Sequence, residues 1–184
     1  MQITPTSTLS AAGSTTEARA LAARVRARTS ANSSTDTFLS HSHKDHEFLP
    51  GVISILEAHG GRVYVDDLDT SLPNVTSPAT AAILKKRIAQ HKKFVAFVTN
   101  HTKDSRWVPW ELGLADGLRT HRNTAVFPAT TSPASASWAE VEYYGLYDKI
   151  VRGRISGLLG ERWIVWNQFL NNAVTLESWL SRVV

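Results

Sequence analysis

The segment from His41 to His46 holds the densest group of metal-binding side chains in the sequence. His41-Ser42-His43-Lys44-Asp45-His46 brings three imidazoles and one carboxylate into six consecutive positions. Imidazole and carboxylate groups are usual zinc ligands, and a zinc ion with an open coordination position activates water for hydrolysis. The structural alternative is a polar turn between a strand and a helix, in which Ser42 or Asp45 caps the helix.

Glu111 is a second candidate, because tryptophans accompany it at helical spacing. Trp107 precedes Glu111 by four residues, so the two side chains share one face if the helix begins at Trp107. An indole ring attracts a planar cation, and a carboxylate in a dry site stabilises positive charge that develops in a reaction. The structural alternative makes Trp107 and Trp110 core residues, and Glu111 an acid favoured in the first helical turn.

Strand and helix patterns alternate through the part of the chain that carries these candidates. β-branched and aromatic runs predict strands at residues 37–39, 63–65, 94–98, 125–127 and 163–166. Apolar residues at helical spacing predict helices at residues 48–56, 80–90, 109–118 and 176–184, and a further helix beginning near Trp138. The alternation predicts an α/β fold with a central parallel five-stranded sheet and helices on both faces.

Polar side chains follow the first two predicted strands. They are Ser40, His41 and Ser42 after the first strand, and Asp66, Asp67 and Asp69 after the second. Ligands of parallel sheets bind beyond the carboxyl ends of the strands, which is where these side chains are expected to lie. The structural alternatives are helix capping for the serines and solvation in the loop 66–78 for the acids.

Residues 1–34 differ in composition from the rest of the chain. They are rich in Ser, Thr, Ala and Arg, with four arginines and a single acid. The pattern predicts a helix over residues 15–29 and a mobile segment over residues 1–13. We therefore divide the chain into an N-terminal extension with a short basic helix, residues 1–34, and one folded domain, residues 35–184.

The composition excludes several classes of protein. The chain has no cysteine, so it has no disulfide, no thiolate zinc site and no cysteine nucleophile. The net charge of +4 comes mostly from residues 1–34, and the remainder does not provide the basic face of a nucleic-acid-binding protein. Because no run of about 18 apolar residues is present, we expect no membrane span.

Three segments, in order, resemble the boxes of the TIR (Toll/interleukin-1 receptor) domain family. Asp36-Thr37-Phe38-Leu39-Ser40-His41-Ser42 is similar to the first box, a strand that ends in Phe-[Ile/Leu]-Ser-[His/Tyr]-Ser. Val63-Tyr64-Val65-Asp66-Asp67 resembles the second TIR strand, and residues 66–78 resemble its long loop. Ser105-Arg106-Trp107-Val108-Pro109-Trp110-Glu111-Leu112-Gly113 resembles the box that holds the catalytic glutamate of NAD-cleaving members. The resemblance covers residues 35–184, although residues 130–162 match poorly.

This resemblance implies a flavodoxin-like TIR fold and an enzyme that cleaves NAD, an NAD glycohydrolase or ADP-ribosyl cyclase with Glu111 as the catalytic carboxylate. The products would be nicotinamide and ADP-ribose or a cyclic ADP-ribose-type signal. Bacterial members of this kind serve in antiphage defence of the Thoeris type, where a downstream effector reads the nucleotide. The residues implied to contact the substrate are Ser40, His41, Ser42, Asp66, Asp67, Asp69, Ser105, Trp107 and Trp110.

The resemblance also sets expectations about cofactors and partners. NAD is expected to be the substrate, with no cofactor and no metal, and the absence of a Gly-x-Gly-x-x-Gly phosphate loop agrees with this. We expect a cytoplasmic protein that self-associates through TIR surfaces and binds neither nucleic acid nor membrane.

A single carboxylate is sufficient for this reaction. Nicotinamide is bonded to ribose as a pyridinium and leaves as a neutral molecule, so no general acid has to protonate it. The ribose carbon becomes oxocarbenium-like, and a carboxylate beside it stabilises that charge. Glycosidases need a second carboxyl group because their leaving group is poorer.

Two other functions compete with this one. A non-catalytic TIR module would bind partners through the loop 66–78 and neighbouring helices, and would not need Glu111 beside Trp107. The histidine-rich string also resembles the metal-binding signature of the metallo-β-lactamase family, although over six residues only. The lesser alternative is therefore a zinc hydrolase that uses His41, His43, Asp45 and His46.

Overall fold

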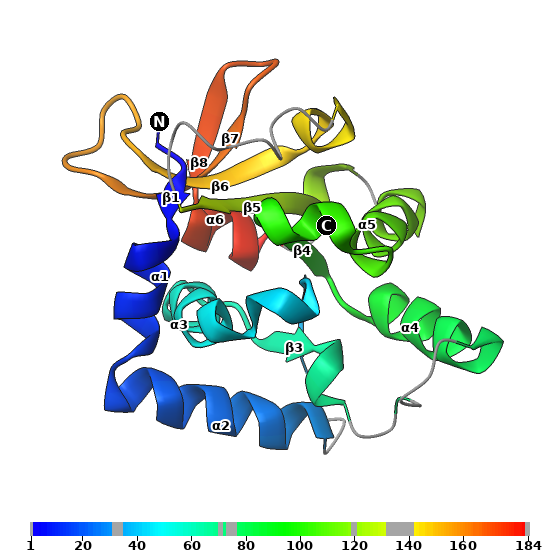
Figure 1. The fold of residues 1–184 in the computed structure, drawn as a ribbon. Coiled ribbons are helices and arrows are strands. Elements are labelled where there is room, and N and C mark those ends of the chain that lie inside the picture. Colours follow the sequence, from blue (N-terminus) through cyan, green and yellow to red (C-terminus); the bar gives the residue numbers. More distant parts are fainter. Residues whose placement is uncertain are drawn as a thin grey trace.

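The chain folds around one central sheet (Figure 1). The structure is a computed structural model that describes residues 2–30, 35–69, 72, 77–118, 121–131 and 142–182. The strands are β1 (Thr4–Pro5), β2 (Thr37–Ser40), β3 (Val63–Val65), β4 (Lys93–Val98), β5 (Thr124–Thr130), β6 (Asp148–Gly153), β7 (Arg162–Asn167) and β8 (Asn172–Thr175). The α-helices are α1 (Thr6–Gly13), α2 (Thr16–Ser30), α3 (Leu49–Ala58), α4 (Pro78–Gln90), α5 (Trp107–Leu118) and α6 (Leu176–Ser181).

Short 3-10 helices connect several of these elements. They lie at His43–Phe48, Asp66–Leu68, Asn100–Asp104, His121–Asn123 and Glu142–Leu146. The helix predicted near Trp138 falls outside the described residues. Within the described ranges, no helix is both long enough and apolar enough to cross a membrane.

The sheet has a flavodoxin-like strand order. Strands β3-β2-β4-β5-β6 are parallel neighbours, so the predicted core of five parallel strands is confirmed. The predicted identity of the fifth strand is wrong, because residues 163–166 belong to β7, which runs antiparallel to β6. The true fifth strand, β6, has only Ile150 and Val151 as an apolar pair between charged neighbours, too short a run to stand out in the sequence.

Helices cover both faces of this sheet, as β4 demonstrates. Val95 and Phe97 belong to a buried cluster that includes α3 and α6, whereas Phe94 and Ala96 belong to another that includes α4 and α5. Successive side chains of a strand point to opposite faces, so β4 needs apolar residues at every position. The continuous run Phe94–Val98 supplies them, and the prediction of helices on both faces is confirmed.

The N-terminal segment is part of the packed structure. Helix α2 confirms the predicted helix over residues 15–29, but the predicted mobility of residues 1–13 is wrong for the described part of that segment. Strand β1 pairs with β5, and α1 lies beside α3 (Figure 1). Leu9 of α1 is fully buried in the cluster that includes residues of α3. One apolar anchor and a close helix contact hold α1, and neither produces a strong helical pattern. The division of the chain at residue 34 stays a prediction.

Gly51 is the residue that lets α1 approach α3, and we predict that Gly51→Ala destabilises the protein. An added Cβ would lie 2.2 Å from the backbone oxygen of Leu9, and overpacking of this kind costs about 1–3 kcal/mol. We expect thermal unfolding followed by circular dichroism to give a melting temperature lower by about 2–10 °C. Gly113→Ala is the matched control, because nothing lies within 4 Å of its added Cβ and alanine favours the helix. Equal melting temperatures for Gly51→Ala and the wild type would contradict the close approach of the two helices.

Candidate functional site

Helix α5 presents Trp107 and Glu111 together. The helix begins at Trp107, so the condition for a shared face is met and the two side chains lie one turn apart. The neighbouring stripe consists of Val108, Leu112 and Ala115, which are buried in the cluster that also contains residues of β4. Packing of this stripe on the sheet fixes the rotation of α5 and brings Glu111 to the carboxyl end of β2.

Glu111 is a buried carboxyl group with a single hydrogen bond among the described residues. Its side chain is almost fully enclosed, with the residue 1% exposed. Ser40, the last residue of β2, donates its hydroxyl to Oε2 at 2.5 Å, while Oε1 has no hydrogen-bond partner in the described part of the chain. Burial raises the pKa of Glu111 well above its usual value, the charge of Asp66 raises it further, and the Ser40 hydrogen bond opposes them.

Three histidines and two aspartates form a second polar group beside Glu111, which we name the His–Asp cluster: His41, His43, His46, Asp66 and Asp67. Parallel pairing of β2 with β3 puts Leu39 opposite Val65, so the residues that follow the two strands meet. Asp67 Oδ2 lies 2.7 Å from His46 Nε2, 3.0 Å from His43 Nδ1 and 3.5 Å from His41 Nε2.

The two aspartates of the His–Asp cluster differ in their electrostatics. Burial raises the pKa of Asp66, more than the nearby His41 lowers it. Burial acts in the same direction on Asp67, but contact with His41 and the charges of the three imidazoles together hold the pKa of Asp67 below its usual value. Both aspartates also act on Glu111, because the negative charge of either carboxylate raises the pKa of Glu111 further.

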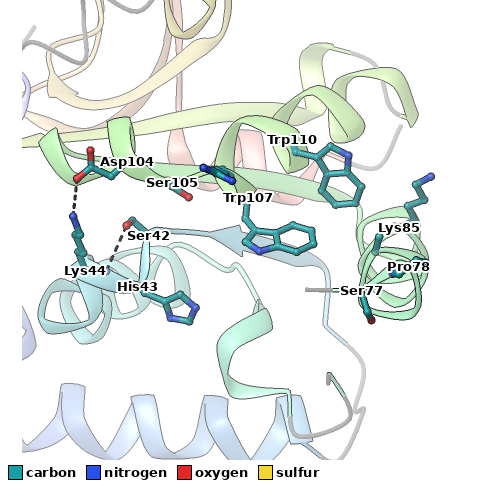
Figure 2. Close-up of a pocket in the computed structure, with 12 residues that line it drawn as sticks. Ser42, His43, Lys44, Ser77, Pro78, Lys85, Asp104, Ser105, Trp107 and Trp110 are labelled. Carbon is teal, nitrogen blue, oxygen red and sulfur yellow. Dashed lines mark hydrogen bonds and ion pairs between the residues drawn. The ribbon is translucent and has the colours of Figure 1, made fainter. Parts of the chain in front are cut away.

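A pocket of about 1000 Å³ opens beside α5. Four predicted site residues line it, namely Ser42, Ser105, Trp107 and Trp110. Figure 2 shows Trp107 between the residues that follow β2 and the start of α4, with Trp110 next to it. The two indole rings meet edge to face, with centroids 5.3 Å apart. This volume lies at the upper end of the range for small-molecule sites.

His43, which the sequence suggested only as a zinc ligand, also lines the pocket. The sequence analysis missed the remaining pocket residues, which are Lys44, Ser77, Pro78, Ala81, Lys85, Asp104 and Arg106. Lys44 Nζ forms an ion pair with Asp104 at 2.6 Å across the pocket rim (Figure 2). Asp104 and Arg106 flank the predicted Ser105, so proximity in the sequence could have indicated them. Lys85 gave no such signal, because its place depends on how α4 packs beside α5.

The structure does not bring every predicted residue to the pocket. Five predicted residues are not among those that line it: Ser40, His41, Asp66, Asp67 and Glu111. Of these, Ser40, His41 and Glu111 are buried next to the pocket, whereas the side chains of Asp66 and Asp67 are partly exposed.

Two aspartates that the sequence analysis singled out have structural partners elsewhere. Asp69 accepts hydrogen bonds from Tyr64 and Arg87, so we keep no substrate role for it. Asp45 accepts hydrogen bonds from Thr99 and contacts His101 Nδ1 at 2.7 Å, so it does not complete the metal set suggested for residues 41–46.

The raised pKa of Glu111 predicts a specific pH dependence of stability. The folded protein holds the Glu111 proton more tightly than the unfolded chain does, so stability is lost as the pH rises above the ordinary value of 4.5. Relative to Glu111→Gln, which does not titrate, the wild-type free energy of unfolding should fall by at most about 1.4 kcal/mol per pH unit. Denaturant unfolding of both proteins from about pH 4 to about pH 8 measures this difference. A difference that stays constant with pH would contradict the buried, titrating carboxyl group.

Comparison with known proteins agrees with this architecture. A family model described as TIR domain matches residues 37–150. The chain is 33% identical over 153 residues to a Bacillus cereus (strain MSX-D12) protein named "Probable 3' cyclic ADP-D-ribose synthase ThsB'", covering 80% of this chain and 76% of that protein. It is 35% identical over 80 residues to a Cytobacillus dafuensis protein named "Putative cyclic ADP-D-ribose synthase TIR2", covering 42% of this chain and 21% of that protein. The chain therefore belongs to the TIR domain family.

Proposed function

We propose that this protein cleaves the bond between nicotinamide and ribose in NAD, with Glu111 as the catalytic carboxylate. The observation that carries the proposal is a buried carboxyl group one helical turn from Trp107, a residue that lines a large pocket. The names of both relatives as cyclic ADP-D-ribose synthases support the same class of reaction.

The electrostatics of Glu111 suit a cationic substrate. In the free protein, burial favours the protonated form of Glu111. A pyridinium brought next to this group would favour the ionised form, because an opposite charge a few ångströms away lowers the pKa of a carboxyl group. The ionised carboxylate would then stabilise the oxocarbenium-like ribose as neutral nicotinamide leaves. Oε1, which has no hydrogen-bond partner among the described residues, is placed to make that contact, whereas Oε2 accepts the hydrogen bond from Ser40.

The pocket offers suitable groups for the rest of the dinucleotide. The face of Trp107 can stack on the nicotinamide ring, a planar cation. Lys85 and Arg106 supply positive charge for the pyrophosphate, whereas the charge of Lys44 is offset by its ion pair with Asp104. We assign Ser42 and Ser105 as hydroxyl donors to the substrate.

Hydrolysis and cyclisation differ in the nucleophile that captures the ribose carbon. Water gives ADP-ribose, whereas a hydroxyl group or ring nitrogen of the same nucleotide gives a cyclic product. We favour the cyclic product, because both relatives carry that activity in their names. A signal of this kind would serve antiphage defence in the cytoplasm, through an effector that reads it.

A non-catalytic interaction module is the competing function. Burial of a carboxyl group reduces stability when one of its oxygens has no hydrogen-bond partner, as is the case for Glu111 within the described residues. A non-catalytic scaffold would have no functional use for such a group. We therefore favour catalysis. Self-association through TIR surfaces fits both functions, and we propose it as the step that opens a path from the pocket to Glu111.

We predict that Glu111→Gln abolishes nicotinamide release from NAD. The amide keeps the size of the side chain but carries no negative charge for the transition state, so we expect a loss of at least about 100-fold. Chromatography of purified protein with NAD, at high protein concentration with and without a crowding agent, measures nicotinamide and every nucleotide product.

The matched control is Glu161→Gln, which makes the same chemical change at an exposed position outside the site. This variant should keep wild-type activity. Release that survives in Glu111→Gln would overturn the catalytic assignment, and absence of release from the wild type under all these conditions would favour the interaction module.

A further inference from the structure

The His–Asp cluster contains a buried histidine that has no side-chain hydrogen bond within the described part of the chain. The side chain of His41 is 2% exposed, and neither ring nitrogen has a hydrogen-bond partner among the described residues. A buried polar group left in this state costs free energy unless something else satisfies it. The nearest polar atoms are carboxylate oxygens, with Asp67 Oδ2 at 3.5 Å from Nε2 and Asp66 Oδ1 at 3.9 Å from Nδ1.

One oxygen of Asp67 serves as the centre of this cluster. In addition to His41, it lies 2.7 Å from His46 Nε2 and 3.0 Å from His43 Nδ1. Two lone pairs on one oxygen do not satisfy three imidazoles at once. His41, His46 and Asp67 each offer one ligand atom, and these atoms all lie within 4.8 Å of one another. Closely spaced ligand atoms of this kind suit a metal ion, because the ligands of an ion surround one centre.

We propose that His41, His46 and Asp67 form a binding site for a divalent transition-metal ion of the zinc class. Two imidazole nitrogens and a carboxylate oxygen are a usual donor set for zinc, and three protein ligands leave a coordination position open. This assignment replaces the expectation of a metal-free protein. It also differs from the string suggested by the sequence, since Asp67 takes the place of Asp45.

Asp66 completes the site as a positioning residue. Metal-bound histidines commonly donate their other ring N–H to a carboxylate, which fixes the ring orientation. Asp66 Oδ1 is buried, has no hydrogen-bond partner in the described residues and lies 3.9 Å from His41 Nδ1. If the distance between Asp66 Oδ1 and His41 Nδ1 became about 1 Å shorter, the two atoms would form this hydrogen bond. His43 lies at the edge with its side chain 78% exposed, and the assignment does not require it.

The ion would lie near both the pocket and Glu111, because His43 of the cluster lines the pocket and the charge of Asp67 acts on Glu111. The neighbouring Ser42 and His43 line the pocket, so the open coordination position is close to space that a ligand can enter. The charge of the ion would offset Asp66 and Asp67, which crowd negative charge around Glu111. Metal binding is independent of NAD cleavage in this proposal and is tested without it.

Titration of the metal-stripped protein with Co²⁺, followed by visible absorption and then by displacement with Zn²⁺, tests this site. We expect one ion per chain, and we expect His46→Gln and Asp67→Asn each to weaken binding by at least about tenfold. The control is His59→Gln, because the His59 ring is near the Ile55 carbonyl and outside the cluster. This variant should bind as the wild type does.

Thermal unfolding with Zn²⁺ gives a second measurement that also reports whether the variants fold. Zinc should raise the melting temperature of the wild type and of His59→Gln, and it should raise that of His46→Gln by less at the same zinc concentration. Absence of saturable binding to the wild type, or equal binding by His46→Gln and Asp67→Asn, would overturn the proposal whatever the outcome of the NAD assay.

Discussion

The hydrogen bond between Ser40 and Glu111 is the interaction on which the candidate site depends. It joins the carboxyl end of β2 to the first turns of α5, and it is the only hydrogen bond of the Glu111 side chain among the described residues. The rest of the environment opposes an ionised carboxylate, through burial and through the nearby charge of Asp66. The fold thus holds a carboxyl group in a state that water would not favour, which is common at catalytic centres.

Sheet topology brings these groups together. Strand β2 lies between β3 and β4, so its carboxyl end meets the residues that follow both neighbours. Helix α5 packs its apolar stripe on the face of the sheet that carries Phe94 and Ala96, which leaves Trp107 beside the pocket. The same parallel pairing that sets Leu39 opposite Val65 creates the His–Asp cluster. One architectural rule, ligand sites beyond the carboxyl ends of parallel strands, accounts for both groups.

Local patterns predicted much of this structure. The run Phe94–Val98 predicted a strand buried on both faces, and the spacing of Trp107 and Glu111 predicted their shared helix face. Strand β6 was missed because charged residues surround Ile150 and Val151, so pairing with β5 and β7 rather than its own sequence defines it. Side-chain contacts between different strands and helices could not be predicted from the sequence either. Asp67 meets the histidines only through strand register.

The pH dependence of kcat/KM for nicotinamide release tests the central claim most directly, because this parameter reports ionisations of the free enzyme. If ionised Glu111 performs the reaction, activity should rise with pH along a limb whose midpoint lies above the ordinary value of 4.5. Ser40→Ala should move that limb to higher pH, since it removes the hydrogen bond that lowers the Glu111 pKa. A profile that is flat through this range, or a limb that Ser40→Ala leaves in place, would contradict the assignment of Glu111 as the catalytic carboxylate.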